Sequence, residues 1–387
     1  MKVLFVLHTT QMHGSTLSFL NLAEGLIGKS VEVAAAGPEL HEELSQRLNS
    51  LGIAYYPVRI AQSVYPQRGR LYLGRLLNLL KRKHNSLCDI QRVAETVKPD
   101  IIHTNTGVIR EGYRVAKKLA IPHVWHLREY QDKDFGWRCF PSKSDLIKHL
   151  KQSHVITVTD DIRDYYDLSD YSKAQTIYNG VCHRDGEGRK VPREPFFLSA
   201  TRISPEKGFE DLLQAFTSFN KQYPSFRLVI LGDGEQQYID SLKAMAQDLG
   251  CSDAIDWKGY TTEVMPYMQR ATALIAASRC EGFGRMTAEA CCAGCMVIGR
   301  NSGGTREILE ATGGLLFNDN QELLHSMLEV ASMPQTAYEE KAYTAQQQAR
   351  RLYSIEGNVD KIYGLYQKIL TDEYKSKDNR FLSSTVS

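Results

Sequence analysis

Two kinds of apolar pattern alternate along the first half of the chain. Short apolar runs, among them "KVLFVL" and "VEVAAAG", are separated by stretches such as "STLSFLNLAEGLIGK", in which apolar residues recur at helical spacing. Later runs read "DIIHTNTG", "HVWHL" and "HVITVT". Strands that alternate with helices are typical of βαβ units and a parallel sheet. The pattern predicts a doubly wound, Rossmann-like first domain over residues 1–183.

The same alternation resumes after a polar segment. Residues 182–195, "CHRDGEGRKVPREP", hold almost nothing to bury and are the best candidate for a linker. Beyond them, runs such as "FFLSATRI", "FRLVILGDG" and "ALIAAS" alternate with helical stretches, which predicts a second Rossmann-like domain over residues 184–356. A final helix, about residues 357–375, is predicted to pack back on the first domain, and residues 376–387 are predicted to be a mobile tail.

Composition narrows the class of protein. With 387 residues the chain exceeds what one hydrophobic core usually supports. A net charge of +2 argues against nucleic-acid binding, which needs a strong basic field. The first apolar run is too short for a signal peptide or a membrane span, and the eight cysteines are scattered. We expect a cytoplasmic α/β protein with reduced thiols, whose two domains face a central cleft.

The segment "EGFGRMTAEA" begins three residues after the apolar run "TALIAAS" ends, and ligands of open parallel sheets bind beside the carboxyl ends of strands. Its glycines allow a close approach of the backbone, and a helix is predicted to begin near Arg285. The first N–H groups of a helix favour an anion, so a phosphate is expected at Arg285, Met286 and Thr287. Glu289 could then bind a diol and Glu281 other hydroxyl groups. Their spacing alone favours two ordinary solvated glutamates. Whether they bind a ligand therefore depends on the other segments of the chain.

Two further segments follow predicted strands. "SATRISPEKGFEDLLQAF" places Arg202 and Lys207 after the first strand of the second domain. An arginine fork and a lysine point charge suit a diphosphate, with two solvated loop cations as the alternative. "RNSGGTREIL" supplies a second glycine turn into a helix, which could bind another phosphate or serve tight packing; its residues are Gly303, Gly304 and Thr305.

In chain order, the second half contains "TRISPEKGFEDLLQAF", "LVILGDGE", "KGYTTE", "EGFGRMTAEACCAGCMVIG" and "SGGTREIL". Together these segments resemble the second domain of the retaining glycosyltransferases of family 4, also called group 1, which have the GT-B fold. The first domain is similar to theirs more weakly, through "VEVAAAG", "PDIIHTN", "IPHVWHLRE", "HVITVTDDIRDYY" and "IYNGV". The resemblance covers nearly the whole chain.

The resemblance implies a UDP- or GDP-linked sugar donor that binds mainly to the second domain and a glycan or lipid-linked acceptor that binds to the first. It implies no metal or other cofactor. It implies that Glu289 holds the ribose, Glu281 the transferred sugar, and Arg202 with Lys207 the diphosphate. His126, in "VWHLRE", matches the family's active-site histidine, with a structural core histidine as the alternative. The remaining donor-binding residues that it implies are Phe283, Gly284, Arg285, Met286, Thr287, Gly259, Tyr260, Asn179 and Gly14.

Three other features are weighed in the same way. "DKD" at Asp132–Asp134 has a metal-binding spacing, but cations already neutralise the diphosphate. "CAGC" at Cys292–Cys295 lacks the second pair of a zinc site, so tight packing explains it better. His8 and His13, on the first strand-to-helix loop, are either ligand contacts or ordinary loop residues. No metal site is predicted.

Residues 70–83, "RLYLGRLLNLLKRK", place leucines on one side of a helix and basic residues on the other. Basic amphipathic helices can lie on anionic membranes. The alternative is a core-packed helix with a solvated basic face. Peripheral contact with the inner face of the membrane is therefore a hypothesis.

The chain departs from the family pattern in two places. Met12, His13 and Gly14 replace a Gly-Gly pair, and Arg285 replaces an apolar residue or proline. Arg285 could add a phosphate contact or read an acidic sugar. The rivals are a nucleotide-sugar epimerase of the same fold and a decayed sugar-nucleotide-binding protein; a nicotinamide-dependent dehydrogenase lacks its G-x-G-x-x-G. We predict a retaining glycosyltransferase that moves a sugar to a glycan or glycolipid in cell-surface polysaccharide biosynthesis.

Overall fold

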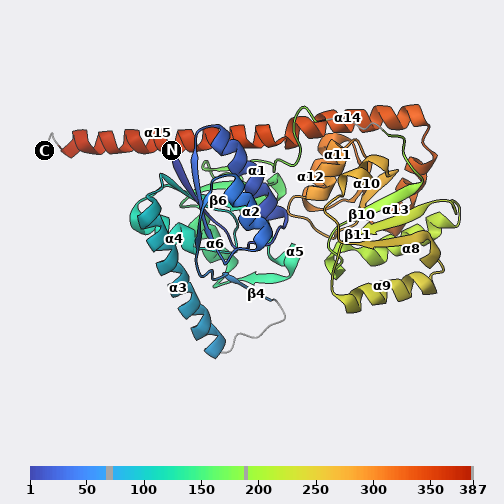
Figure 1. Ribbon diagram of the computed structural model, residues 1–387, viewed down its shortest axis with the longest axis horizontal. Helices are drawn as coiled ribbons and strands as arrows, with labels where there is room; N and C mark the ends of the chain where they lie inside the picture. The colour runs from blue at the N-terminus through green and yellow to red at the C-terminus, as the bar shows by residue number, and fades with distance from the viewer. Residues whose placement is uncertain (67–72, 187–190, 385–387) are drawn as a thin grey trace. The chain divides into compact units, whose positions relative to one another are not determined.

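The computed structural model describes residues 1–66, 73–186 and 191–384, and of residues 73–76 and 374–384 it describes the backbone alone. The chain divides into two compact units (Figure 1). Unit 1 comprises Met1–Gly180 together with the chain from Ile355 onward, and unit 2 comprises Val181–Ser354. Residues 187–190 of the predicted linker lie outside the described residues.

Within the described residues, unit 1 is built on a parallel sheet of seven strands in the order β3-β2-β1-β5-β6-β8-β9. The strands are β1 (Lys2–Val6), β2 (Glu32–Gly37), β3 (Ala54–Pro57), β5 (Ile101–Thr104), β6 (His123–Leu127), β8 (His154–Thr157) and β9 (Ala174–Thr176). A separate antiparallel ribbon joins β4 (Val64–Pro66) to β7 (Trp137–Cys139). The helices are α1 (Gly14–Gly28), α2 (Glu42–Ser50), α3 (Leu73–Val97), α4 (Glu111–Leu119), α5 (Asp132–Phe135), α6 (Lys143–Leu150), α7 (Asp160–Tyr165) and α15 (Ile355–Ser384).

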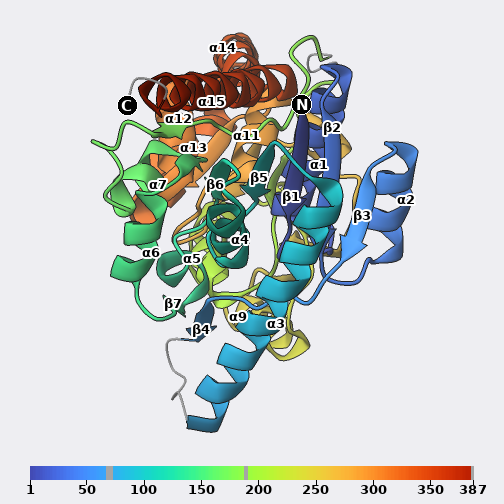
Figure 2. The ribbon, with the colours of Figure 1, turned by 90° about the vertical axis from the view of Figure 1, so that its left-hand side faces the viewer.

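Helices cover both faces of the unit 1 sheet, so its central strands β1, β5 and β6 are almost wholly buried. α3 and α4 pack together on one face, and α1 with α15 packs on the other (Figure 2). A Cβ atom on Gly25 of α1 would lie 2.4 Å from a methyl group of Val359, so only glycine lets α15 approach this closely. α15 also runs through the segment that the sequence predicts to be a mobile tail, as far as Ser384, because no glycine or proline follows Gly364 to end it. Residues 385–387 lie outside the described residues.

Unit 2 has a parallel sheet of six strands among its described residues, in the order β12-β11-β10-β13-β14-β15. The strands are β10 (Phe196–Ala200), β11 (Arg227–Leu231), β12 (Ile255–Gly259), β13 (Ala273–Ala276), β14 (Val297–Arg300) and β15 (Leu315–Phe317). The helices are η1 (Pro205–Lys207), α8 (Phe209–Asn220), α9 (Gln236–Asp248), η2 (Ser252–Ala254), α10 (Met265–Arg270), α11 (Arg285–Cys292), α12 (Gly303–Thr312), α13 (Asn320–Ser332) and α14 (Gln335–Tyr353). Figure 1 shows α8 and α9 on one face of this sheet and α11, α12 and α14 on the other.

The alternating pattern of the sequence is confirmed in both units. Every apolar run named above forms a buried parallel strand, and the fold class is α/β with parallel sheets. Five short strands were not predicted, β3, β4, β7, β9 and β15, because three or four residues are too few to show a period.

Candidate active site

The central feature of unit 2 is an ion pair between Lys207 and Glu281. Lys207 Nζ lies 2.7 Å from Glu281 Oε1, and the two side chains are 16% and 26% exposed. Lys207 ends η1, and the next residue, Gly208, has φ +69° and no room for a Cβ atom beside the carbonyl oxygen of Ala277. This close approach holds Lys207 beside the carboxyl end of β13. The structure thus brings together two residues predicted to share a site.

The turn between Glu281 and α11 is built from glycines of two segments. Gly284 precedes α11 with φ +85°, in the left-handed region that favours glycine. The amide of Gly304 donates to the carbonyl oxygen of Glu281 at 2.8 Å, and a Cβ atom on Gly304 would lie 2.3 Å from the carbonyl oxygen of Phe283. The second glycine turn therefore packs against the first. Of the two roles considered for Gly303 and Gly304, phosphate binding and tight packing, this contact supports tight packing.

The predicted donor residues along this turn differ in burial. Phe283 is buried and its ring lies 5.8 Å from that of Tyr353, while Thr287 is also buried. Met286 is half-buried in the first turn of α11. The N–H groups of a first helical turn have no partner within the helix and carry the positive end of its dipole. The start of α11 can therefore accept an anion.

Arg285, the departure from the family pattern, is paired with the predicted ribose carboxylate. Its Nε atom lies 2.7 Å from Oε1 of Glu289, one helical turn away. The side chains are 19% and 17% exposed. Burial raises the pKa of the Glu289 carboxyl group, and the Arg285 charge opposes that rise. Arg285 thus stabilises the ionised form of Glu289, which is the form that accepts hydrogen bonds from a diol.

Arg202 does not share the ion pair of Lys207 and Glu281, but pairs with another glutamate. Its side chain is 58% exposed, and Nη2 lies 2.6 Å from Oε1 of Glu206. Burial opposes ionisation of Glu206, but hydrogen bonds from Ser204 and Arg202 hold its pKa below the ordinary value. Sequence reasoning missed Glu206, although its spacing of four residues from Arg202 was a visible signal.

The end of β12 carries the residues predicted to face a nucleobase. Gly259 has φ +72°, and its carbonyl oxygen accepts a hydrogen bond from the amide of Gly232 at 2.9 Å. Tyr260, which follows, is 67% exposed. The backbone here is thus tied to the adjacent strand end, while the Tyr260 side chain is available to a ligand.

His126, in unit 1, is 1% exposed and belongs to a buried network. Its Nδ1 atom lies 3.2 Å from Nη2 of Arg128 and 3.2 Å from Nε2 of His103. Because a guanidinium only donates, His126 Nδ1 must accept, so His103 donates through Nε2 and accepts the Tyr366 hydroxyl at Nδ1, over 2.5 Å. His126 Nε2 is buried with no hydrogen-bond partner among the described residues. Burial, reinforced by Arg128, holds the pKa of both histidines well below 6.5.

Arg128 connects this network to two strand ends. It donates to the side chain and the carbonyl oxygen of Asn105, at 2.9 and 3.1 Å, and to Oδ1 of Asn179 at 2.5 Å. Asn179, predicted to line a cleft, is thus held by Arg128 in unit 1 and is 7% exposed. Arg128 was missed although it directly follows β6; the pairing of Tyr366 with His103, 263 residues apart, left no signal in the sequence.

The predicted residues of the first loop of unit 1, His8, His13 and Gly14, differ in burial and in their contacts. Gly14 is exposed and begins α1, and His13 precedes it with Nε2 2.8 Å from Oε1 of Gln11. Burial, with the charge of Arg128, lowers the pKa of His8 to about 4. His8 is half-buried, whereas His13 is exposed.

The two metal-like motifs have structural contacts. Asp132 accepts the Tyr165 hydroxyl at 2.6 Å, and Asp134 accepts the Tyr130 amide at 2.9 Å. Cys292 and Cys295 are buried. In the part of the chain that the structure describes, no cluster of three or more histidine, cysteine or acidic side chains could hold a metal ion.

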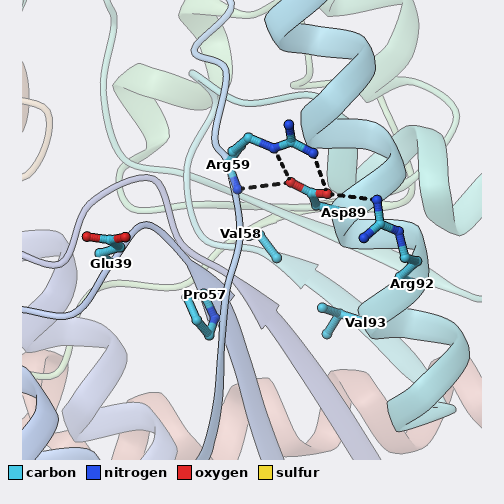
Figure 3. A pocket seen from close by; sticks show the side chains of 7 residues that line it. All are labelled: Glu39, Pro57, Val58, Arg59, Asp89, Arg92 and Val93. Carbon is cyan, nitrogen blue, oxygen red and sulfur yellow. Dashed lines mark hydrogen bonds and ion pairs between the residues drawn. The ribbon is translucent and has the colours of Figure 1, made fainter.

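A pocket of about 400 Å³ opens in unit 1 where β2 and β3 end against α3 (Figure 3). Asp89 of α3 accepts two hydrogen bonds from the Arg59 side chain, at 2.6 and 2.8 Å, and lies 3.3 Å from Arg92. Glu39 lies across the pocket from them. No residue predicted from the sequence lines this pocket, which was missed because its parts come from three separate segments.

Residues 185–350 match the family described as glycosyl transferases group 1. An alpha-monoglucosyldiacylglycerol synthase of Acholeplasma laidlawii is 27% identical over 367 residues, which cover 83% of this chain and 85% of that protein. An enzyme of the same name from Streptococcus pneumoniae is 25% identical over 288 residues, 65% of this chain and 64% of its own.

Solved structures share the fold. HepE of Anabaena, in complex with UDP and glucose, superposes with a TM-score of 0.77 at 18% identity and covers 95% of this chain and 100% of its own. A variant of S. aureus TarM in complex with UDP gives a TM-score of 0.75 at 14% identity, over 94% of this chain and 99% of its own. With the glycine turn into α11, residues 185–350 match the glycosyl transferases group 1, and the chain has the GT-B fold of the solved structures that it resembles.

Proposed function

We propose that this protein is a retaining, metal-independent glycosyltransferase that moves a sugar from a UDP- or GDP-linked donor to a glycan or glycolipid acceptor in cell-surface polysaccharide biosynthesis. The Lys207–Glu281 ion pair beside the start of α11 carries the proposal. Two relatives named as glucosyldiacylglycerol synthases support a glycolipid product, and HepE, solved with UDP-glucose, supports a UDP-linked donor.

In this proposal the diphosphate lies at the first turn of α11 and accepts from Lys207. Cleavage of the anomeric bond places negative charge on the departing diphosphate, so a fixed cation stabilises the transition state more than the ground state. Loss of one such donor typically costs about 3 kcal/mol. Glu281, which Lys207 pairs with in the free protein, is left to bind hydroxyl groups of the transferred sugar.

Retention needs no protein nucleophile in this scheme, because the departing diphosphate can accept the proton of the incoming hydroxyl group on the same face. The positive charges of Lys207 and the α11 terminus take the place of a metal ion, with Arg202 close along the chain to Lys207. We assign His126 the role of positioning Arg128. It is 1% exposed, so it does not face solvent, and its Nδ1 atom accepts a hydrogen bond from Arg128.

For the nucleoside, Glu289 binds the ribose diol while Arg285 keeps that carboxylate ionised. Arg285 is itself at the first turn of α11, where the diphosphate is proposed. It is thus placed to couple recognition of the ribose to recognition of the phosphates. Gly259 and Tyr260 are the proposed neighbours of the base, and Gly14 and Asn179 remain proposed donor contacts from unit 1.

Thermal unfolding with UDP, GDP and their sugar conjugates tests the donor assignment. A ligand at 100 times its Kd stabilises the native state by about 2.7 kcal/mol. We expect a stabilising shift with one nucleotide series, and its loss in Glu289→Ala. The absence of a shift with every nucleotide would overturn the proposed function.

The exposed leucines of α3 support peripheral contact with the inner membrane face. Leu77 and Leu80 are 59% and 48% exposed, and Lys81 and Arg82 beside them are exposed. Residues 70–72 of the predicted basic helix lie outside the described residues. No helix in the described chain is both long and apolar enough to cross a bilayer.

Sedimentation with vesicles of anionic and of zwitterionic phospholipid tests this contact. We expect binding to the anionic vesicles at low salt, and weaker binding in the double variant Leu77→Gln/Leu80→Gln. Equal sedimentation of the variant and the wild-type protein would refute the role of α3.

A further inference from the structure

A second pocket of unit 1, about 410 Å³, lies beyond the carboxyl end of β6. Tyr130 and Asp132 come from the segment after β6, Tyr65 from β4, and Trp137 from β7. Figure 2 shows β4, β7, α5 and α6 gathered on one side of unit 1. The pocket has the size of a small-molecule site and stands at the sheet edge where ligands of α/β proteins bind.

Aromatic rings make up much of the pocket wall, and their positions are fixed. The Tyr165 hydroxyl donates to Asp132 Oδ1 at 2.6 Å, and the Tyr130 hydroxyl donates to Asp161 Oδ2 at 2.6 Å. The Tyr130 and Tyr165 rings meet edge to face, with centroids 5.1 Å apart. Hydroxyl groups anchored in this way leave the rings little freedom to lose when a ligand binds.

Trp137, at the start of β7, lines the pocket and belongs to a stacked pair of rings. The Phe135 and Trp137 rings are stacked with centroids 4.7 Å apart and planes 18° from parallel. Phe135 is 45% exposed, which is unusual for a phenylalanine. The pair offers a flat apolar surface beside the pocket, of the kind that proteins keep exposed at binding sites.

Charged side chains lie between these rings and contact them. Lys143 Nζ lies 3.1 Å from the centroid of the Tyr165 ring, and Lys133 Nζ lies 4.8 Å from it. The Asp132 carboxylate and the Arg138 guanidinium line the same wall, so charges of both signs face the pocket. An alkyl chain could form no hydrogen bond with any of these charged groups.

An uncharged sugar ring fits both halves of this surface. One face of a pyranose presents C–H groups, which pack on aromatic rings, and its edge presents hydroxyl groups, which both donate and accept hydrogen bonds. Asp132 can accept from such hydroxyl groups, and Lys143 can donate to them. The flat rings suit a saccharide rather than a phosphate, and the charged groups of both signs suit it rather than a lipid tail.

We propose that the pocket formed by Tyr65, Tyr130, Trp137, Tyr165, Asp132 and Lys143 binds an uncharged sugar ring of the acceptor. This inference rests on the proposed function, and it narrows that function because the acceptor must already carry a sugar. An earlier glycosyl transfer must then supply the acceptor. A lipid without a saccharide headgroup is not the acceptor that this site recognises.

Binding of the full chain to an array of neutral and acidic oligosaccharides tests the proposal. We expect retention by at least one neutral oligosaccharide, and a fall of at least tenfold in both Trp137→Ala and Asp132→Asn. Asp132→Asn keeps an oxygen that accepts the Tyr165 hydroxyl, so it covers the case in which Trp137→Ala does not fold. Tyr343→Ala is the matched control, because Tyr343 is an exposed aromatic residue of α14 and is 63% exposed.

Three results would overturn the proposal. They are retention by no neutral oligosaccharide, equal retention of wild-type protein and Asp132→Asn, and retention by sugar-free diacylglycerol vesicles that depends on Trp137. The thermal shift with UDP or GDP is measured on the same samples. Its absence in wild-type protein counts against the proposed function, whereas a normal shift with a failed oligosaccharide test counts against this pocket alone.

Discussion

The candidate sites of the two units are built in opposite ways. In unit 2, Lys207, Glu281, Arg285 and Glu289 form charged pairs whose side chains are 16% to 26% exposed. In unit 1, His103 and His126 are almost completely buried and neutral, and are held by hydrogen bonds from Tyr366 and Arg128. A ligand can replace one partner of a partly exposed ion pair. A buried network resists rearrangement, because every lost hydrogen bond leaves an unsolvated group. Substitutions should therefore alter binding and turnover in unit 2, and stability in unit 1.

The largest effect is expected from Lys207→Ala. Removal of one donor to the departing diphosphate should lower turnover by about a hundredfold or more, with little change in stability. Sugar transfer and thermal unfolding of the same preparation measure both. Arg227→Ala is the matched control, because Arg227 forms a 2.6 Å ion pair with Asp256 at the opposite end of β11. A Lys207→Ala protein with near-normal turnover would remove Lys207 from the site.

Arg285→Met sharpens the comparison within unit 2. If Arg285 couples ribose and phosphate recognition, the variant should lose about tenfold or more in affinity for the nucleoside diphosphate, as hydrogen bonds to charged groups contribute about 1.5–3 kcal/mol. Affinity for the parent nucleoside should change much less. Calorimetric titration with both ligands measures the difference. An equal loss for the two ligands would mean that Arg285 serves Glu289 alone.

Tyr366→Phe tests the buried network of unit 1. Loss of the hydroxyl leaves His103 Nδ1 buried without a donor, which should lower the free energy of unfolding by about 1–3 kcal/mol. Nucleotide binding by unit 2 should be unchanged. Denaturant unfolding and the nucleotide shift report the two properties, and Tyr343→Phe, at an exposed position, serves as the control. A fully stable Tyr366→Phe protein would show that the network adds nothing to the fold.

The smallest effect per side chain is acid sensitivity in unit 1, where burial also lowers the pKa of His8, His123 and His154. Burial holds the pKa of His103 and His126 well below 6.5, so below that pH the unfolded chain binds protons that the folded unit does not. Stability therefore falls as pH falls, and each histidine should cost about 0.8 kcal/mol by pH 6. Hydrogen exchange at pH 7.5 and pH 6 resolves the two units. A loss of protection that is as large in unit 2 would contradict this assignment.

The same contrast explains what could be predicted from the sequence. Strands and helices of both units follow local apolar periods, and Glu281 and Lys207 were found because they lie in the loops that follow apolar runs. The Arg285–Glu289 pair was visible as a spacing of four residues, yet Arg285 was weighed only against phosphate and sugar. The partners of His126 could not be predicted, since Tyr366 reaches His103 across 263 residues and no local pattern encodes such a contact.

The path of α15 has a consequence for biosynthesis. Unit 2 is one continuous stretch, Val181–Ser354, and can bury its core as soon as that stretch leaves the ribosome. Unit 1 lacks four core residues, Val359, Ile362, Tyr366 and Ile369, until the last part of the chain is made. The half that is synthesised first is therefore the half that is completed last. While unit 2 is being translated, the surface of α1 that α15 later covers is exposed. Chaperones can bind this apolar surface on the nascent chain.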